Sequence, residues 1–251
     1  MPRVPGTQPE GARDEREAAS MIREMFSRIA PRYDLLNHLL SFSLDRVWRR
    51  RTARRFRHIL TRPHANVLDL CCGTGDLTLA LAAAAVTKCH EGATVWGSDF
   101  AHPMLVRALE KSAAKGVRYF EADAMRLPCA DASVDLVTAA FGFRNLANYE
   151  AGLREIHRVL RPGGEAGILE FAAPRNRFIG MMYRLYFSHI VPRVGGSISG
   201  NRAAYAYLPV SVDKFPEREE LHANMHQIGF RDAHTELWTF GIVALHTARK
   251  A

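Results

Sequence analysis

Three features of the chain combine residue types that bind a charged small molecule: a glycine loop and two carboxylates, each placed after a short apolar stretch. Gly73, Thr74 and Gly75 follow the stretch 66–71 and precede an Ala/Leu-rich helical pattern. Glycine lets the backbone approach a ligand closely, and the first turn of the following helix presents free N–H groups. Asp99 ends the next apolar stretch, 24 residues after Gly75, where a carboxylate can accept both hydroxyls of a ribose. Together these residues predict a nucleotide-type cofactor site.

The third feature is the run Asp123-Ala124-Met125, which follows another short apolar stretch. An acidic side chain next to a free backbone N–H can bind the N6 amine and N1 of an adenine. The alternative is that Asp123 caps the N-terminus of a helix. Because Asp123 occurs together with the glycine loop and Asp99, the adenine interpretation is favoured.

Two classes of cofactor fit this arrangement, and the residues around the loop separate them. A dinucleotide-binding loop has a third small residue three positions after Gly75, where this chain has Thr78. No Lys-Ser/Thr pair follows the loop, which excludes a Walker-type phosphate site. Asp76 at the start of the helix disfavours a pyrophosphate but suits a cofactor that carries a sulfonium and an ammonium group. The sequence therefore favours S-adenosylmethionine as the cofactor.

These residues require a fold that brings several strand ends together, and the chain alternates short apolar stretches with helical patterns. Strands are expected at 66–71, 93–98, 117–121, 134–140, 166–171, 231–236 and 237–246, and helices near 102–114, 149–160 and 217–229. This alternation predicts an α/β, Rossmann-like fold with a doubly wound, mostly parallel seven-stranded sheet. The carboxyl ends of its parallel strands would place the loop and the carboxylates at one edge.

The remaining segments predict a tail, N-terminal helices and a lid. Residues 1–18 are rich in Pro, Gly and charge without periodicity, which predicts a disordered tail, and residues 19–62 are expected to contain helices. The segment 172–216 interrupts the alternation just after the fifth strand and contains the apolar run 178–191. We expect it to form a helical lid at the carboxyl edge of the sheet, and we interpret residues 19–251 as a single domain.

Composition excludes several other classes of protein. The 251 residues are 47% apolar and carry a net charge of +8, which is ordinary for a globular protein. No apolar run reaches the roughly 20 residues of a membrane span, and the N-terminus lacks the apolar core of a signal peptide. The four cysteines, at positions 71, 72, 89 and 129, form no CxxC pair and show no metal-site spacing with histidine. We therefore expect a soluble cytoplasmic protein with reduced thiols and no metal.

Positive charge is concentrated near the N-terminus, where residues 1–65 hold fourteen Arg and seven acidic residues. A helix expected near 45–60 places Trp48, Thr52 and Phe56 on one face. The rest of its surface is crowded with arginines, namely Arg46, Arg49, Arg50, Arg51, Arg54, Arg55 and Arg57. The simplest interpretation is a solvated face, and the second is attachment to an anionic membrane surface. Nucleic acid is not expected as a partner, because no aromatic side chains alternate with the arginines.

Several motifs beyond the loop resemble those of a known family. They are FSRIAPRYDLLN (26–37), SFS (41–43) with Trp48, LDLCCGTGD (68–76), FGFRN (141–145) and VALH (243–246). They resemble the C-methyltransferases of menaquinone and ubiquinone biosynthesis, a class I, S-adenosylmethionine-dependent family, over residues 22–250. The resemblance implies cofactor contacts from the loop at Gly73 and Thr74, from Asp99, and from Asp123 with Ala124. The chain departs from the family pattern at Cys71-Cys72, where Ala-Gly is common, and at Ala140, where a Ser is frequent.

The resemblance also implies a methyl acceptor that is a quinol, whose reduced, electron-rich ring carbon attacks the methyl group. Arg144 and Asn145 follow the fourth strand and are expected to face this acceptor. Arg144 would stabilise an anionic oxygen or hold a water as base, and Asn145 would orient it. His189 in the lid is a second candidate base. Structural roles, an ion pair for Arg144 and packing for His189, remain open, as does closure of Tyr33 over the cofactor.

The expected reaction is C-methylation of demethylmenaquinol, an isoprenoid quinol. Three alternatives stay open: methylation of a polyprenyl benzoquinol, methylation of another small hydrophobic acceptor, and a protein that binds the cofactor without transferring its methyl group. Because the acceptor's tail partitions into lipid, we expect a cytoplasmic protein that visits the inner face of the membrane. The sequence does not decide whether the chain forms a homo-oligomer.

Overall fold

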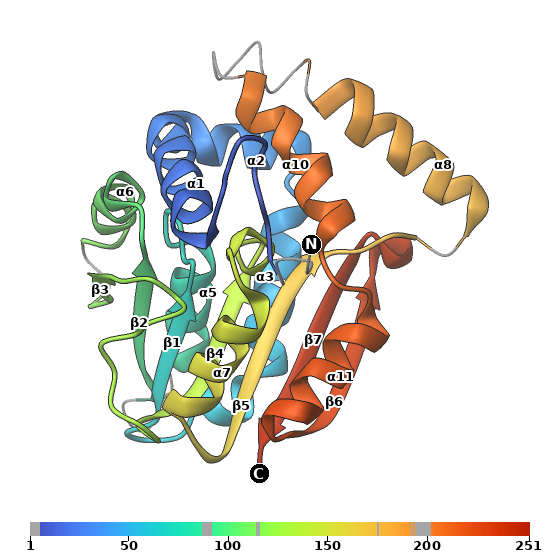
Figure 1. Ribbon diagram of the computed structural model, residues 1–251. Coiled ribbons are helices and arrows are strands. Elements are labelled where there is room, and N and C mark those ends of the chain that lie inside the picture. The colour runs from blue at the N-terminus through green and yellow to red at the C-terminus, as the bar shows by residue number, and fades with distance from the viewer. Residues whose placement is uncertain (1–5, 87–91, 114–115, 175, 192, 194–201) are drawn as a thin grey trace.

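A seven-stranded sheet with helices on both faces forms the centre of the computed structural model, which describes residues 6–86, 92–113, 116–174, 176–191, 193 and 202–251 (Figure 1). Within these residues the strand order is β3-β2-β1-β4-β5-β7-β6. The strands span Asn66–Leu70 (β1), Thr94–Asp99 (β2), Arg118–Glu121 (β3), Val134–Ala140 (β4), Leu160–Phe171 (β5), Phe230–Trp238 (β6) and Val243–Lys250 (β7). Strands β1 to β5 pair in parallel, and β7 runs antiparallel to both β5 and β6. The predicted α/β class and mostly parallel sheet are confirmed.

The order of the strands reverses at β1, which pairs with β2 on one side and with β4 on the other. Open α/β sheets bind ligands beyond the carboxyl ends of their strands at such a switch point. The glycine loop follows β1, Asp99 ends β2, and the short 3-10 turn η2 (Phe143–Asn145) follows β4. The fold therefore brings the candidate residues to one edge of the sheet.

Two layers of helices cover the sheet, and the central strands β1 and β4 are buried almost throughout, as expected for strands covered on both sides. One face is covered by α7 (Tyr149–Val159) and α11 (Arg218–Ile228) (Figure 1). The other is covered by α3 (Leu44–Arg55), α4 (Arg57–Leu60) and α5 (Asp76–Ala85). Helix α6 (His102–Ser112) packs on β2 and β3.

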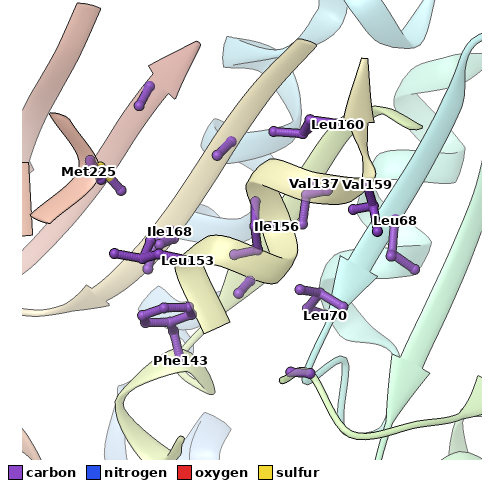
Figure 2. Close-up of a cluster of buried hydrophobic side chains, with 14 of the residues drawn as sticks. Leu68, Leu70, Val137, Phe143, Leu153, Ile156, Val159, Leu160, Ile168 and Met225 are labelled. Carbon is purple, nitrogen blue, oxygen red and sulfur yellow. The ribbon is translucent and has the colours of Figure 1, made fainter. Parts of the chain in front are cut away.

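Figure 2 shows the core between the sheet and the first of these layers. Leu153 and Ile156 of α7 lie over Val137 of β4 and Ile168 of β5, and Met225 of α11 belongs to the same cluster. All five side chains are at most 1% exposed. Burial of each such side chain is worth about 1.5–3 kcal/mol, so the strands form a rigid support for the loops at their ends.

The N-terminal helices and the segment after β5 cover the carboxyl edge of the sheet (Figure 1). The N-terminal part consists of α1 (Glu15–Ile29), the 3-10 turn η1 (Ala30–Arg32), which contains Pro31, and α2 (Tyr33–Leu40). The lid segment contains α8 (Arg177–Leu185), the π-helical turn η3 (Tyr186–Ile190) and α10 (Arg202–Lys214). No helix in the described ranges is long and apolar enough to cross a membrane.

The structure differs from the predicted disordered tail in the described residues 6–18. Thr7 is completely buried, its N–H donates to the carbonyl of Leu146 at 2.8 Å, and α1 begins at Glu15. Asp14 caps this helix by accepting the N–H of Glu17. The periodicity of apolar residues could not predict these contacts, because they depend on distant partners and on a single helix cap.

Two element boundaries also differ from the expectation. The helix predicted near 45–60 is divided at Phe56 into α3 and α4. The last strand begins at Val243 and not near 237, because β6 continues to Trp238 and the turn η4 (Thr239–Gly241) reverses the chain. Gly241 has a φ of 86° in this turn, a conformation that glycine adopts without strain.

Candidate functional site

Two adjoining cavities lie at the carboxyl edge of the sheet. The first, here called the loop cavity, is lined by the loop at Gly73 and by the ends of β2 and β4. The second, the apolar cavity, has a volume of about 390 Å³ and is lined mainly by aromatic and aliphatic side chains of the N-terminal helices and the lid segment. The two cavities share four lining residues, Phe26, Tyr33, Phe141 and Asn145. A ligand in one cavity therefore borders a ligand in the other.

The glycine loop is held in a conformation that requires glycine. Gly73 and Gly75 have φ values of 55° and 84°, and a Cβ on Gly75 would lie 2.6 Å from the Tyr119 hydroxyl. The Thr74 hydroxyl donates to Asp34 and accepts from Lys111 at 3.1 Å. Thr74 therefore lies beside the loop cavity with its hydroxyl already engaged, and its side chain lines a small neighbouring pocket with Asp76.

The two loop cysteines that depart from the family pattern carry protonated thiols in this environment. Burial raises the pKa of the Cys71 and Cys72 thiols well above their ordinary value, so both are neutral. Cys71, Cys72 and Cys129 are free thiols, and Cys89 lies outside the described residues.

Asp99 is 7% exposed and is oriented by two backbone groups. One carboxylate oxygen accepts the N–H of Gly73 and the other accepts the N–H of Ala101, both at 2.9 Å. Burial raises the pKa of Asp99 to about 6, so the carboxylate is largely ionised at pH 7. Each oxygen retains a lone pair that can accept a hydroxyl hydrogen.

Asp123 and Ala124 line the loop cavity next to Met125. Asp123 accepts the N–H of Met125 through its side chain at 2.8 Å and the N–H of Arg126 through its carbonyl. No helix begins at this turn among the described residues, so the helix-cap alternative for Asp123 is wrong. The turn leaves the second carboxylate oxygen of Asp123 available to a ligand.

Arg144 is buried beside the apolar cavity and already has a carboxylate partner. Its Nη1 donates to Glu170 at 2.8 Å and to the carbonyl of Phe141, and its Nε donates to Ser211. Glu170 is completely buried and also accepts the backbone N–H of Arg144. Although burial alone lowers it, Glu170 keeps the pKa of Arg144 above its ordinary value. Arg144 is thus a permanent cation, which can stabilise an anion but cannot take up a proton.

Asn145 lies in the wall shared by the two cavities. Its side-chain oxygen accepts the hydroxyl of Tyr207 at 3.2 Å, and the Tyr207 hydroxyl is also within 2.7 Å of the Thr7 hydroxyl. The buried N-terminal segment thereby helps to fix the orientation of the Asn145 amide. The partners at positions 7 and 207 have no signal in the local sequence around FGFRN.

His189 does not lie where a base would be needed. Its side chain is exposed and is absent from the lining of the apolar cavity, whereas Tyr186 and Phe187 of the same turn face the cavity. The structure thus contradicts our prediction that His189 is a second catalytic base. The π-helical turn η3 changes the direction in which the residues after Tyr186 point, and an α-helical periodicity does not predict that change.

An ionic network that sequence analysis missed lies between the apolar cavity and the glycine loop. Asp45, 3% exposed, contacts Arg49 and lies 2.8 Å from Nδ1 of His38. Asp76 lies 3.7 Å from Arg49, 3.9 Å from His38 and 2.5 Å from Lys111. The carboxylate and imidazole atoms of His38, Asp45 and Asp76 lie within 4.8 Å of one another, and Arg49 and Lys111 provide the positive charge beside them.

Arg49 consequently does not belong to the solvated arginine face that we predicted. It is 7% exposed, and its guanidinium lies over the ring of Phe141, 5.6 Å from the centroid. The i, i+4 spacing of Asp45 and Arg49 was the one sequence signal for this pair. The other arginines of α3 and α4 named above are exposed, and Arg55 pairs with Glu236.

The strand order, the loop after β1 and the acidic end of β2 together define a class I methyltransferase fold. A solved S-adenosylmethionine-dependent methyltransferase from Aquifex aeolicus matches with a TM-score of 0.60 at 16% identity, covering 87% of this chain and 98% of that one. A solved methyltransferase from Thermotoga maritima matches with a TM-score of 0.60 at 16% identity, and the match covers 92% of this chain and 100% of that one.

Comparison with sequence families identifies the family within this class. The model of the ubiE/COQ5 methyltransferase family matches residues 12–250. The demethylmenaquinone methyltransferase of Thermus thermophilus is 51% identical over 224 residues, which is 88% of this chain and 98% of the relative. That of Deinococcus radiodurans is 46% identical over 239 residues, 94% and 95% of the two chains. The ubiquinone/menaquinone biosynthesis C-methyltransferase of Geobacter sulfurreducens is 41% identical, and the match covers 93% of this chain and 90% of the relative. The chain therefore belongs to the ubiE/COQ5 methyltransferase family, as its motifs indicated.

Proposed function

We propose that this methyltransferase transfers the methyl group of S-adenosylmethionine to a ring carbon of demethylmenaquinol. The observation that carries the proposal is the wall shared by the two cavities, which lets a cofactor in one border an apolar acceptor in the other. The names of the Thermus and Deinococcus relatives support the same acceptor.

The residues of the loop cavity fit the proposed cofactor. Asp99 offers two oriented oxygens to the ribose hydroxyls, and Asp123 with the backbone at Met125 offers polar groups to the adenine. Gly73 leaves room for the ligand beside Tyr33, because even a Cβ on Gly73 would stay 3.6 Å from that ring. When bound, the cofactor supplies an electrophilic methyl group. Asp76, which we expected near its ammonium group, is paired with Lys111.

The apolar cavity provides what a quinol ring needs in order to react. Trp48, Phe141 and Phe171 form a cluster with ring centroids 4.7–6.4 Å apart in its wall, and these rings exclude water. Ionisation of a quinol hydroxyl increases the nucleophilicity of the ring carbon, and the buried Arg144 cation favours the ionised form. Asn145, in the shared wall, would hold the ring oxygen close to the transferred methyl group.

The acceptor assay tests this proposal. Transfer of labelled methyl groups should be measured to reduced naphthoquinol and reduced benzoquinol side by side, with cofactor binding followed by calorimetry. We expect transfer to the naphthoquinol. Preference for the benzoquinol would assign the chain to ubiquinone synthesis, and transfer to neither, with the cofactor bound, would favour a protein that only binds the cofactor.

We also propose that the protein is cytoplasmic and visits an anionic membrane surface to collect its acceptor. Phe42 and Phe240 are 77% and 78% exposed, and both have positive φ values, 52° and 57°. Such backbone is strained for a bulky residue, so the fold holds two aromatic side chains in water at a cost. Phe42 lines the apolar cavity, and Phe240 follows the cavity residue Thr239.

The charges around these residues suit an anionic surface. In the segments 35–51, 176–191 and 239–242 the one acidic residue is the buried Asp45. The exposed charged side chains of these segments are Arg46, Arg50, Arg51, Arg177 and Arg184. Each basic residue near an anionic surface contributes about 1 kcal/mol to binding.

Vesicle binding tests the membrane proposal. Because Asn is polar and tolerates positive φ, the double variant Phe42→Asn/Phe240→Asn should stay folded and lose binding to anionic vesicles. Salt should weaken binding of the wild type. Leu109→Gln, which removes an exposed apolar residue on α6, is the matched control. Equal binding of wild type and double variant, or equal binding to neutral and anionic vesicles, would contradict the proposal.

A further inference from the structure

Methylation of a ring carbon releases a proton, and the residues considered so far cannot accept it. The C–H bond at the methylated carbon must break, its electron pair must restore the aromatic ring, and the proton must go to a base. Arg144 and Arg49 are already protonated cations. Burial raises the pKa of each of the four tyrosines in the apolar cavity, namely Tyr33, Tyr183, Tyr186 and Tyr207.

Asp45 is the one anionic side chain among the described residues that line the apolar cavity. Its Oδ1 accepts the Ser41 hydroxyl at 2.7 Å, and its Oδ2 contacts Arg49 and His38. Oδ1 therefore keeps a lone pair for a proton. Asp99 and Asp123 are the carboxylates of the loop cavity, where the proposed cofactor would cover them.

His38 connects Asp45 to solvent. Its Nδ1 lies 2.8 Å from Asp45, and its Nε2 lies 3.9 Å from Asp76. His38 does not line the apolar cavity but lines an open groove between α3 and α5, together with Asp76, Lys111 and exposed arginines of α3. The pair thus spans the wall between the acceptor and water.

The pair and the charged groups around it carry one net negative charge, which one added proton would balance. His38 and Asp45 are surrounded by Arg49 on α3, Asp76 on α5, Lys111 on α6 and, through Lys111, Asp34 on α2. With a neutral imidazole the cluster holds three carboxylates against two cations. Uptake of one proton by the pair makes the cluster neutral overall.

We propose that Asp45 and His38 form the proton-accepting pair of the reaction, an inference that rests on the proposed function. The ring proton moves to Oδ1 of Asp45, while the Nδ1–H of His38 donates to Oδ2 and holds the ionised carboxylate in place before the transfer. The protonated Asp45 then loses its proton to water when the methylated product leaves the cavity. Although burial raises it, Arg49, Ser41 and His38 hold the pKa of Asp45 below its ordinary value, so the proton does not remain on the carboxylate.

The test uses an acceptor deuterated at the carbon that is methylated. We expect a deuterium effect on kcat near unity in the wild type, because proton loss is fast. In His38→Gln, kcat should fall about 10²-fold, the range of general-base contributions, the deuterium effect should rise well above unity, and added imidazole should restore part of the rate. Cofactor affinity should stay unchanged. A merely structural His38 would not alter the deuterium effect.

Two further variants complete the experiment. His58→Gln is the matched control, because His58 lies 3.0 Å from Glu165 far from either cavity, and it should behave as the wild type. If Asp45→Asn folds, it should reproduce the raised deuterium effect. If it does not fold, the result for His38→Gln alone tests the proposal. A His38→Gln protein with wild-type kcat and deuterium effect would overturn the proposal. A wild type that methylates no quinol would overturn the proposed function instead.

Discussion

Asp99 is a buried carboxylate, and in the proposed cofactor site its ionisation would decide whether the ribose hydroxyls find a charged acceptor. Its pKa of about 6 is raised by burial, so lowering the pH through 6 protonates it and removes acceptor capacity. We predict that the dissociation constant of the cofactor is flat above pH 7 and rises as the pH falls below 6. In Asp99→Asn, binding at pH 7.5 should be weaker by roughly 10–100-fold, since hydrogen bonds to a charged group contribute about 1.5–3 kcal/mol. Calorimetry across pH checks this, and an Asp99→Asn protein that keeps the wild-type pH dependence would refute the assignment.

Arg144 pairs with the buried Glu170 and has the chemical role proposed above, and the choice of substitution separates the two. Arg144→Ala would leave Glu170 buried without a partner, which destabilises a protein by about 3–5 kcal/mol. Arg144→Lys keeps the positive charge but loses the planar guanidinium that contacts three partners. We predict that Arg144→Lys is folded, binds the cofactor within a few-fold of wild type, and turns over roughly 10²–10³-fold more slowly. Unchanged turnover, measured with labelled cofactor, would mean that Arg144 serves only as the partner of Glu170.

The sequence predicted which residues come together in the loop cavity but missed the ionic network, because the two depend on different kinds of signal. Gly73, Asp99 and Asp123 follow strand ends, so the fold alone brings them to one cavity. His38 and Asp76 are 38 residues apart and belong to α2 and α5. Their contact depends on how two helices pack, which no local pattern encodes.

The lid segment shows how an element can be predicted while its orientation is not. Its apolar composition and its place after β5 predicted a cover for the carboxyl edge, and α8 and η3 do supply part of the apolar cavity. However, the π-helical turn η3 breaks the α-helical periodicity, and the sequence did not reveal that Phe187 is buried and Ile190 is 45% exposed.

A pair of tyrosines tests the orientation of this lid. The Tyr183 hydroxyl is buried and has no hydrogen-bond partner among the residues that the structure describes, whereas the Tyr186 hydroxyl donates to the carbonyl of Leu40 at 2.7 Å. An unsatisfied buried polar group costs about 1–3 kcal/mol, and a satisfied hydrogen bond contributes about 1 kcal/mol. We predict that Tyr183→Phe raises the free energy of unfolding and Tyr186→Phe lowers it, as measured by urea denaturation. Changes of the same sign in both variants would show that the lid packs differently.

At the scale of the whole molecule, the fold places the proposed cofactor site and the proposed acceptor site in two adjoining cavities. A rigid parallel sheet carries the glycine loop and Asp99, while the N-terminal helices and the lid segment enclose the apolar cavity. The sequence predicted this division because the strand–helix alternation and the lid insertion are distinct patterns. It did not predict the buried N-terminal segment at Thr7, whose partners Leu146 and Tyr207 lie more than a hundred residues away.

The central claim is that a reduced ring carbon in the apolar cavity receives the methyl group. The most direct measurement supplies ¹³C-methyl-labelled S-adenosylmethionine and one naphthoquinone acceptor, either reduced or oxidised, and locates the label in the product by NMR. We predict a single new aromatic C-methyl signal with the reduced acceptor and no product with the oxidised one, because an oxidised ring carbon is not nucleophilic. Label on an oxygen, or equal transfer to the oxidised ring, would contradict the claim.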